Sequence, residues 1–159
     1  MTAPSPDEAL RQRIRDDPYA AWLGIELLEL VPGYCRAAMR LQPQMVNFHG
    51  MPHGGAIFSL ADYAFSVACN AHGETAVALS VTIQFLAAAA PGARLTAEAR
   101  AERQGRQAGF YVMTVTDEQG RVVASCHAVA LRPREVYRKD AAADAWKGCL
   151  AFFEKHLKA

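Results

Sequence analysis

One segment of the sequence has almost no polar side of its own. Residues 54–71 read GGAIFSLADYAFSVACNA, and in a helix their apolar side chains would leave no face for water. We expect this helix to be buried nearly all round, because exposed apolar surface is unfavourable and another layer of the protein must cover it. A fold for this chain therefore has to wrap one helix in other secondary structure.

The covering layer is predicted to be a β-sheet. Six segments have the composition of strands and are bounded by turn residues: 25–31, 34–42, 75–88, 93–105, 109–117 and 121–132. The last four follow one another along the chain with turn residues between them, which is typical of an antiparallel sheet. We expect an α+β fold in which the sheet wraps over the helix.

The two ends of the chain are predicted to add helices. DEALRQRIRDD, residues 7–17, is typical of a short helix that stops near Pro18. Residues 140–159 have the spacing of an amphipathic helix, with large apolar residues on one side: Trp146, Leu150, Phe153 and Leu157. We therefore divide the chain into a single domain, residues 1–135, and a C-terminal helical appendage, residues 136–159.

Length and composition exclude several classes of function. A chain of 159 residues fits one domain, and its net charge of +1 gives no electrostatic footprint for a nucleic acid. The N-terminus is polar and charged, unlike a signal peptide. No apolar run approaches the ~20 residues that span a bilayer. We therefore expect a cytoplasmic protein without nucleic-acid or membrane partners.

The cysteines and histidines do not predict a metal site. His49 and His53 have a metal-like spacing, but the Gly- and Pro-containing loop between them would not hold both on one helical face. Cys126 stands beside His127, and neighbours on a strand point to opposite faces, which disfavours a catalytic pair. We expect no metal, a place for His53 near the helix cap, and free, buried thiols at the four cysteines: Cys35, Cys69, Cys126 and Cys149.

The apolar helix contains one acid, Asp62. A buried carboxylate is costly unless it is hydrogen-bonded, so Asp62 either caps a neighbouring loop or takes part in chemistry. Chemistry is favoured by Gly54 and Gly55, whose backbone N–H groups at the helix start could stabilise an oxyanion. Asn47 and His53 add polar side chains just before that point. The strand after the helix also carries polar residues at period two, which suggests a wet face: Ser80, Thr82 and Gln84.

The spacing between Gly54 and Asp62 predicts a site shared by two chains. Eight residues of helix separate them by about 12 Å along the axis, so one carbonyl group cannot contact both within one chain. Two such helices lying antiparallel across a two-fold axis would bring each helix start to the acid of the other chain. We therefore expect a homodimer with two identical sites.

The region around Asp62 resembles a known enzyme family. The run N-x-x-G-x-x-H-G-G-x-x-x-x-L-A-D-x-A-x-x-x-A-C-N, from Asn47 to Asn70, is similar to the hotdog-fold acyl-CoA thioesterases of the phenylacetate-degradation (PaaI-like) type. The similarity continues through TIQFL and RQGRQAGFY, and covers roughly residues 20–132. One stretch departs from the family, since residues 87–95 read AAAAPGARL where relatives carry an Arg-Pro-like turn.

The resemblance implies a fold, an assembly and a reaction. The fold would be a curved antiparallel sheet around a long central helix, and the dimers would commonly pair into tetramers. Asp62 would activate water or attack a thioester carbonyl, while the Gly54 N–H polarises that carbonyl. Asn47 and His53 match positions that orient water or shape the oxyanion site. The substrate would be phenylacetyl-CoA, hydroxyphenylacetyl-CoA or a related acyl-CoA, with no metal and no further cofactor.

The resemblance and the residue types also indicate substrate contacts. Gly55 lets a ligand approach the helix start, and Ser80 and Thr82 match strand positions near the attacking water. Polar and basic residues on later strands and turns are candidates for the CoA phosphates: Arg103, Arg106, Gln107, Arg132 and Arg134.

Two other functions stay open from the sequence. A hotdog dehydratase acting on acyl thioesters would usually need a catalytic His–acid pair or a different histidine placement. A non-catalytic acyl-CoA-binding regulator would be expected to carry a DNA-binding segment or to lack the acid. Asp62 behind an HGG helix start favours the thioesterase.

Overall fold

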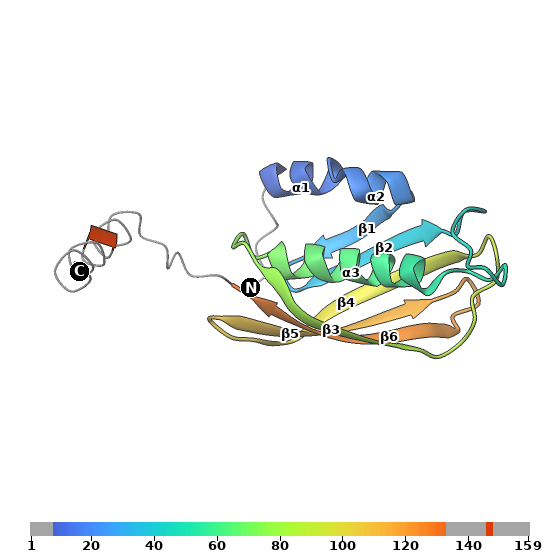
Figure 1. Cartoon of the computed structure of the whole chain (residues 1–159). Helices are drawn as coiled ribbons and strands as arrows, with labels where there is room; N and C mark the ends of the chain where they lie inside the picture. Colours follow the sequence, from blue (N-terminus) through green and yellow to red (C-terminus); the bar gives the residue numbers. More distant parts are fainter. Residues whose placement is uncertain (1–7, 133–145, 148–159) are drawn as a thin grey trace, which may run out of the picture.

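The computed structural model describes residues 8–132 together with Trp146 and Lys147 (Figure 1). Two short helices come first, α1 (Glu8–Arg15) and α2 (Pro18–Leu23). The remaining elements are β1 (Glu26–Val31), β2 (Tyr34–Arg40), α3 (Gly54–Asn70), β3 (Val77–Phe85), β4 (Arg94–Gln104), β5 (Ala108–Thr116) and β6 (Val122–Leu131). The predicted C-terminal helix and Cys149 lie outside the described residues, apart from the helical pair 146–147. None of the described helices is long and apolar enough to cross a membrane.

The six strands form one antiparallel sheet in the order β1-β2-β4-β5-β6-β3. The turns predicted after β4 and β5 are confirmed, because β4 pairs with β5 and β5 with β6. The expectation that β3 continues into β4 as its neighbour is wrong, since β3 pairs with β6 and lies at the sheet edge opposite β1. The chain leaves β3 still attached to β6, because the N–H groups of Leu86 and Ala87 both bond to the Val123 carbonyl. Residues 86–93 then carry the chain across to β4.

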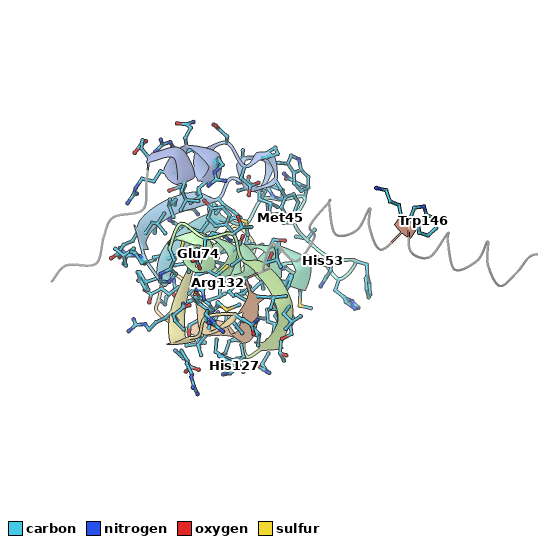
Figure 2. All side chains as sticks on the ribbon, turned by 90° about the vertical axis from the view of Figure 1, so that its left-hand side faces the viewer. Met45, His53, Glu74, His127, Arg132 and Trp146 are labelled. Atoms are coloured by element: carbon cyan, nitrogen blue, oxygen red, sulfur yellow. The ribbon has the colours of Figure 1, made fainter. Side chains whose placement is uncertain are left out.

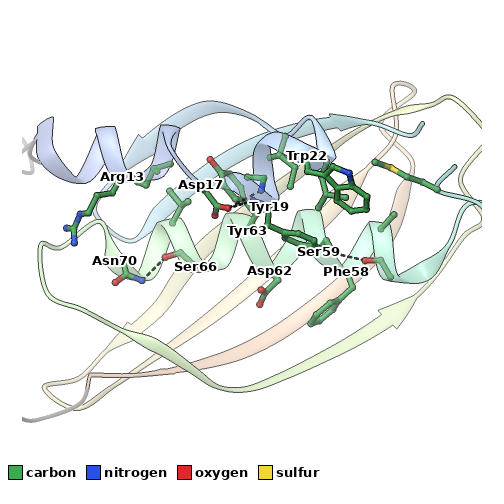
Figure 3. Close-up of a pocket in the computed structure, with 18 of the residues that line it drawn as sticks. Arg13, Asp17, Tyr19, Trp22, Phe58, Ser59, Asp62, Tyr63, Ser66 and Asn70 are labelled. Carbon is green, nitrogen blue, oxygen red and sulfur yellow. Dashed lines mark hydrogen bonds between the residues drawn. The ribbon is translucent and has the colours of Figure 1, made fainter. Parts of the chain in front are cut away.

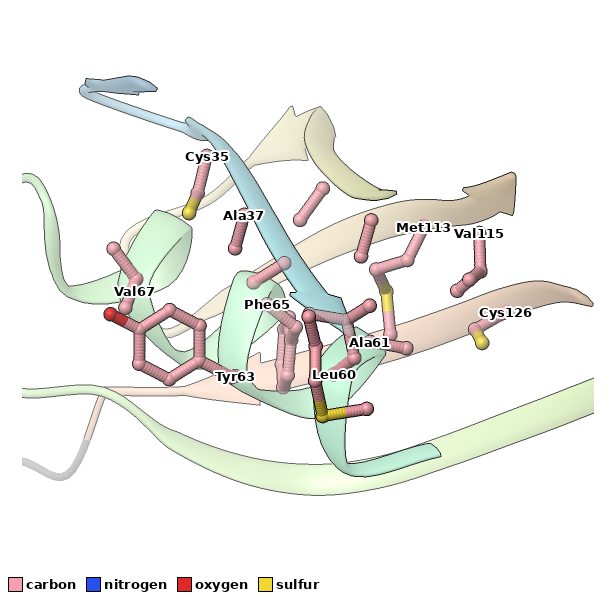
Figure 4. Packing of buried hydrophobic residues seen from close by; sticks show 14 of the residues in the cluster. Cys35, Ala37, Leu60, Ala61, Tyr63, Phe65, Val67, Met113, Val115 and Cys126 are labelled. Carbon is pink, nitrogen blue, oxygen red and sulfur yellow. The ribbon is translucent and has the colours of Figure 1, made fainter. Parts of the chain in front are cut away.

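Helix α3 lies in the concave side of this sheet, as predicted (Figure 1). Leu60, Ala64 and Phe65 on α3 are at most 1% exposed. The Phe65 ring meets Tyr111 of β5 edge-on, with centroids 5.2 Å apart, and Figure 4 shows Phe65 among the buried side chains of the cluster. Burial of one such large side chain contributes roughly 1.5–3 kcal/mol. The predicted α+β class and the hotdog arrangement, a helix wrapped by a curved antiparallel sheet, are therefore confirmed.

The N-terminal segment forms two helices where one was predicted. Pro18 ends α1 as expected, but it also begins α2. Asp17 is the N-cap of α2, and its carboxylate accepts two backbone N–H groups at 2.9 and 3.0 Å. Gly24 ends α2 with a φ of 69°, a conformation that glycine adopts without strain. Asp-Pro before an apolar run is a helix-start signal, so α2 could have been read from the sequence.

Candidate active site

Helix α3 begins in a loop that its own polar side chains organise. The side-chain oxygen of Asn47 accepts two backbone N–H groups of this loop, at 2.9 and 3.2 Å. His53 is the N-cap of α3, and its Nδ1 accepts the Gly55 N–H at 2.9 Å. The predicted place of His53 at the helix cap is confirmed. His53 thus accepts the Gly55 N–H. The neighbouring Gly54 N–H makes no hydrogen bond with any of the described residues.

Gly54 lies against an aromatic ring. A Cβ at position 54 would lie 3.0 Å from the Cζ atom of Phe85, the last residue of β3. A side chain there would force the ring to move. The absence of a side chain at Gly54 thus keeps the free N–H group close to an apolar wall, where a hydrogen bond to a developing negative charge is stronger than in water.

One polar stripe runs along α3, so the expectation of burial nearly all round is wrong. Ser59 and Asp62 are partly exposed and Ser66 is exposed. The stripe consists of residues three or four positions apart, which share one side of a helix: Gly55, Ser59, Asp62, Ser66 and Asn70. This spacing is a signal the sequence contains. In the sequence, two serines among many apolar residues do not predict an exposed side of the helix. That side becomes evident only when the structure shows that the sheet covers the other sides of α3.

Asp62 is the acid on this stripe, and it is half-buried. No described residue hydrogen-bonds to its carboxylate or forms an ion pair with it, so the alternative of a loop cap finds no support in the described part of the chain. Burial raises the pKa of Asp62 above its usual 3.8. A carboxylate with a raised pKa and no partner can accept a proton from water or attack an electrophile.

Asp62 lines a groove of about 850 Å³ between α3 and the N-terminal helices (Figure 3). Tyr19 of α2 bridges the groove, because its hydroxyl lies 3.2 Å from the Ser59 Oγ. Ser59 donates its own proton to the Gly55 carbonyl at 2.9 Å, so the Tyr19 hydroxyl is the donor in this contact. The sequence reasoning missed Tyr19, Trp22 and Ser59 as groove residues, because the contact between α2 and α3 joins positions 40 residues apart.

The chain by itself does not bring Ser80 and Thr82 to Asp62. Ile83 faces the core opposite Cys126, so its neighbour Thr82 points to the outer side of the sheet, opposite His127. Figure 2 shows His127 on the far side of the sheet from the helices. Ser80 shares this outer face, because it pairs with Val129. A contact of these residues with substrate therefore stays a prediction.

The other predicted substrate contacts lie near the end of β4 and in the turn between β4 and β5. Arg103, Arg106 and Gln107 are exposed there and do not line the groove around Asp62. Arg132 is held against the same turn, since its guanidinium donates to the Gly105 carbonyl at 2.6 Å and contacts the Gln104 side-chain oxygen. Arg134 lies outside the described residues. The roles of these residues toward CoA stay predictions.

The described cysteines are free and buried, as predicted: Cys35, Cys69 and Cys126. Burial raises the pKa of the Cys126 thiol to about 11, and the side chains of Cys126 and His127 point to opposite faces of β6. A nucleophilic Cys–His pair is therefore disfavoured at this position. Within the described residues, no three His, Cys, Asp or Glu side chains are grouped to hold a metal ion.

Comparisons with known proteins identify the family of this chain. Residues 49–124 match the family model described as "Thioesterase superfamily". The acyl-coenzyme A thioesterase PaaI of Escherichia coli K12 is 41% identical over 109 residues, which cover 69% of this chain and 78% of that protein.

Two solved structures have the same fold and substantial identity. The E. coli PaaI protein from the phenylacetic acid degradation operon superposes with a TM-score of 0.76 at 37% identity, covering 78% of this chain and 90% of that one. A mutant of the phenylacetic acid degradation protein PaaI from Thermus thermophilus gives a TM-score of 0.71 at 34% identity, covering 74% of this chain and 100% of that one.

The hotdog fold and these similarities define a thioester hydrolase. The chain belongs to the thioesterase superfamily and, within it, to the PaaI-like acyl-CoA thioesterases.

Proposed function

We propose that this protein hydrolyses arylacyl-CoA thioesters to the free acid and CoA, with phenylacetyl-CoA and hydroxyphenylacetyl-CoA as the first candidates. The observation that carries the proposal is the Asp62 carboxylate, which has no partner among the described residues and stands in a groove with aromatic side chains in its lining. The names of two relatives, which refer to phenylacetic acid degradation, support the choice of acyl group. Phe58, Tyr19 and Trp22 line the groove and offer aromatic surface for an aryl ring.

In the proposed reaction, ionised Asp62 acts on the thioester carbonyl, either by taking a proton from the attacking water or by attacking the carbon itself. The carbonyl oxygen becomes negative as the new bond forms, and a Gly54 N–H stabilises it. Collapse of the intermediate breaks the C–S bond. When water is the nucleophile, Asp62 passes the proton it took from water to the leaving sulfur, and the products are the free acid and CoA. When Asp62 is the nucleophile, the leaving thiolate takes a proton from solvent, and water then hydrolyses the acyl–Asp62 anhydride to the free acid and regenerates Asp62. A base or nucleophile and an oxyanion donor suffice for this chemistry, so no metal or cofactor is needed.

We further propose that the site is completed by a second copy of the chain, and that dimers pair into tetramers. Asp62 and Gly54 of one chain are eight residues apart on the same helix, too far to share one carbonyl group. Strand β3 is an edge strand, so one row of its backbone groups is unpaired, and its apolar side chains Val77, Leu79 and Phe85 are exposed. Both features favour pairing of β3 with another chain. Light scattering after gel filtration tests the assembly, and a monomer would contradict it.

The first experiment is hydrolysis of a panel of CoA esters, phenylacetyl, hydroxyphenylacetyl, benzoyl, butyryl and palmitoyl, followed by loss of the thioester absorbance. Fast turnover that is selective for the arylacetyl esters is expected. Asp62→Asn should bind substrate but lose turnover by orders of magnitude. Asp16→Asn, an exposed acid outside the groove, is the matched control and should turn over normally. Uniformly slow turnover with tight binding would instead indicate a binding protein.

Hybrid dimers test the shared site. Subunits with Asp62→Asn are mixed with subunits whose helix start is blocked at Gly54, and the hybrids are expected to regain activity because one of their two sites is intact. Hybrids that are well mixed and still inactive would show that the assignment of Asp62 and Gly54 to one site across two subunits is wrong.

A further inference from the structure

The two ends of the groove beside Asp62 have different chemistry. Toward the start of α3 the lining is largely apolar and aromatic, with Tyr19, Trp22 and Phe58 (Figure 3). Toward the end of α3 polar side chains join the lining, with Ser66 and Asn70 on α3, and Arg13 of α1 stands at the same end of the groove (Figure 3). An acyl-CoA has the same asymmetry, because an acyl group stands on one side of its thioester and a phosphate-bearing nucleotide on the other.

The length of the polar end fits the arm of CoA. Asn70 follows Asp62 by eight residues of helix, which is about 12 Å along the axis. The pantetheine arm between the thioester sulfur and the first phosphate has about a dozen bonds, comparable to four extended residues or about 14 Å. A thioester placed at Asp62 therefore brings its phosphates to the part of the groove where Arg13 stands.

Arg13 is available for an anion. Its side chain is exposed, and no described residue forms an ion pair or hydrogen bond with it. The two acids that line this part of the groove, Glu74 and Asp17, are both engaged. Glu74 lies 3.5 Å from the Nε of Arg132, and Asp17 caps α2 through its carboxylate. Figure 2 shows Glu74 and Arg132 together at this end of the molecule.

Further positive charge stands at the same end. Arg132 links Glu74, which lines the groove, to the turn between β4 and β5, because its guanidinium bonds to the Gly105 carbonyl. Arg106 stands in that turn, and Arg103 stands near the end of β4. A ligand with several phosphates that leaves the groove here can reach these guanidinium groups, with Arg13 at the entrance.

We infer that acyl-CoA lies along α3 in one direction, with its acyl group at the α2 end and its phosphates at the α1 end, where Arg13 binds them. Arg13 is thus a substrate-binding residue for the nucleotide part of CoA. This inference rests on the proposed function, and it adds the orientation of the substrate and the residue that sets it.

The test compares two substrates that share an acyl group. Phenylacetyl-CoA carries the phosphates, and the phenylacetyl thioester of N-acetylcysteamine lacks them. Arg13→Gln is expected to raise KM for the CoA ester about five- to tenfold, where tenfold corresponds to about 1.4 kcal/mol, with kcat unchanged. KM for the truncated ester should stay the same. Arg13→Lys should keep most of the affinity, since a lysine also binds phosphate as a point charge.

Arg15→Gln is the matched control, because Arg15 is on the same helix, is exposed and does not line the groove. It should change neither KM. Equal KM for wild type and Arg13→Gln with the CoA ester would overturn the inference, as would equal increases for both substrates. Binding of CoA itself, measured by calorimetry, separates this result from the proposed function. If no thioester is hydrolysed, the function fails, while loss of CoA affinity in Arg13→Gln still supports the phosphate site.

Discussion

Replacing Asp62 by asparagine is expected to make the protein more stable while it removes activity. Half-burial without a described partner raises the pKa of Asp62 above its ordinary value of 3.8, so the ionised form costs free energy in the folded state. Asparagine has a similar shape and no charge. At pH 8 the carboxyl is ionised in both the folded and the unfolded protein, and the full cost of holding that charge is present in the wild type.

The pH dependence follows from the direction of the shift. A carboxyl whose folded pKa is raised favours folding most at low pH, where it is protonated in both states, and this contribution is lost as the pH rises through the folded pKa. The advantage of Asp62→Asn over wild type is therefore complete at pH 8. It fades as the pH falls through the raised pKa toward 3.8.

The expected size of the effect is modest. Stabilising single substitutions commonly give about 0.5–2 kcal/mol, and the partial exposure of Asp62 places this one near 1 kcal/mol. For a chain of this length, that corresponds to a rise in Tm of about 2–4 °C. Calorimetric scans of both proteins at pH 8 and at pH 4 measure it, with Asp16→Asn as the control. An unchanged or lower Tm for Asp62→Asn at pH 8 would mean that the carboxylate makes a stabilising contact, and would refute the reasoning.

Three further predictions concern the helix start, the core and the thiols. Gly54→Ala should lower kcat with little change in Tm, because its methyl group crowds the approach of the carbonyl to the backbone N–H of residue 54 and meets only the movable ring of Phe85; an unchanged kcat would show that the carbonyl does not approach this helix start. Phe65→Ala should lower the free energy of unfolding by about 3–5 kcal/mol in urea titrations, whereas the exposed Phe48→Ala should change it by less than about 0.5 kcal/mol. The buried thiols of Cys35, Cys69 and Cys126 should react with alkylating reagents only after the protein unfolds, and mass spectrometry can follow the labelling. Rapid labelling of the native protein would show instead that the structure opens at these thiols.

The parts of the fold that depend on nearby residues could be predicted from the sequence. Helix α3 was expected at residues 54–71 and is found at Gly54–Asn70, because its Gly start, its apolar run and its end are all local signals. The hairpins around β5 were predicted from their turn residues. The importance of Asp62 was also readable, since an acid in an apolar helix is costly wherever that helix packs.

Other features depend on contacts between residues far apart in the sequence. Strand β3 pairs with β6 rather than β4, and this choice sends Thr82 to the outer side of the sheet. The groove beside Asp62 exists because α2 packs over α3 through the contact of Tyr19 with Ser59, and its polar end is defined by Arg13 of α1. Local propensity and periodicity fix which elements form. Which faces those elements bury, and which side chains then share a groove, depends on packing between distant segments, and the sequence records no distance between them.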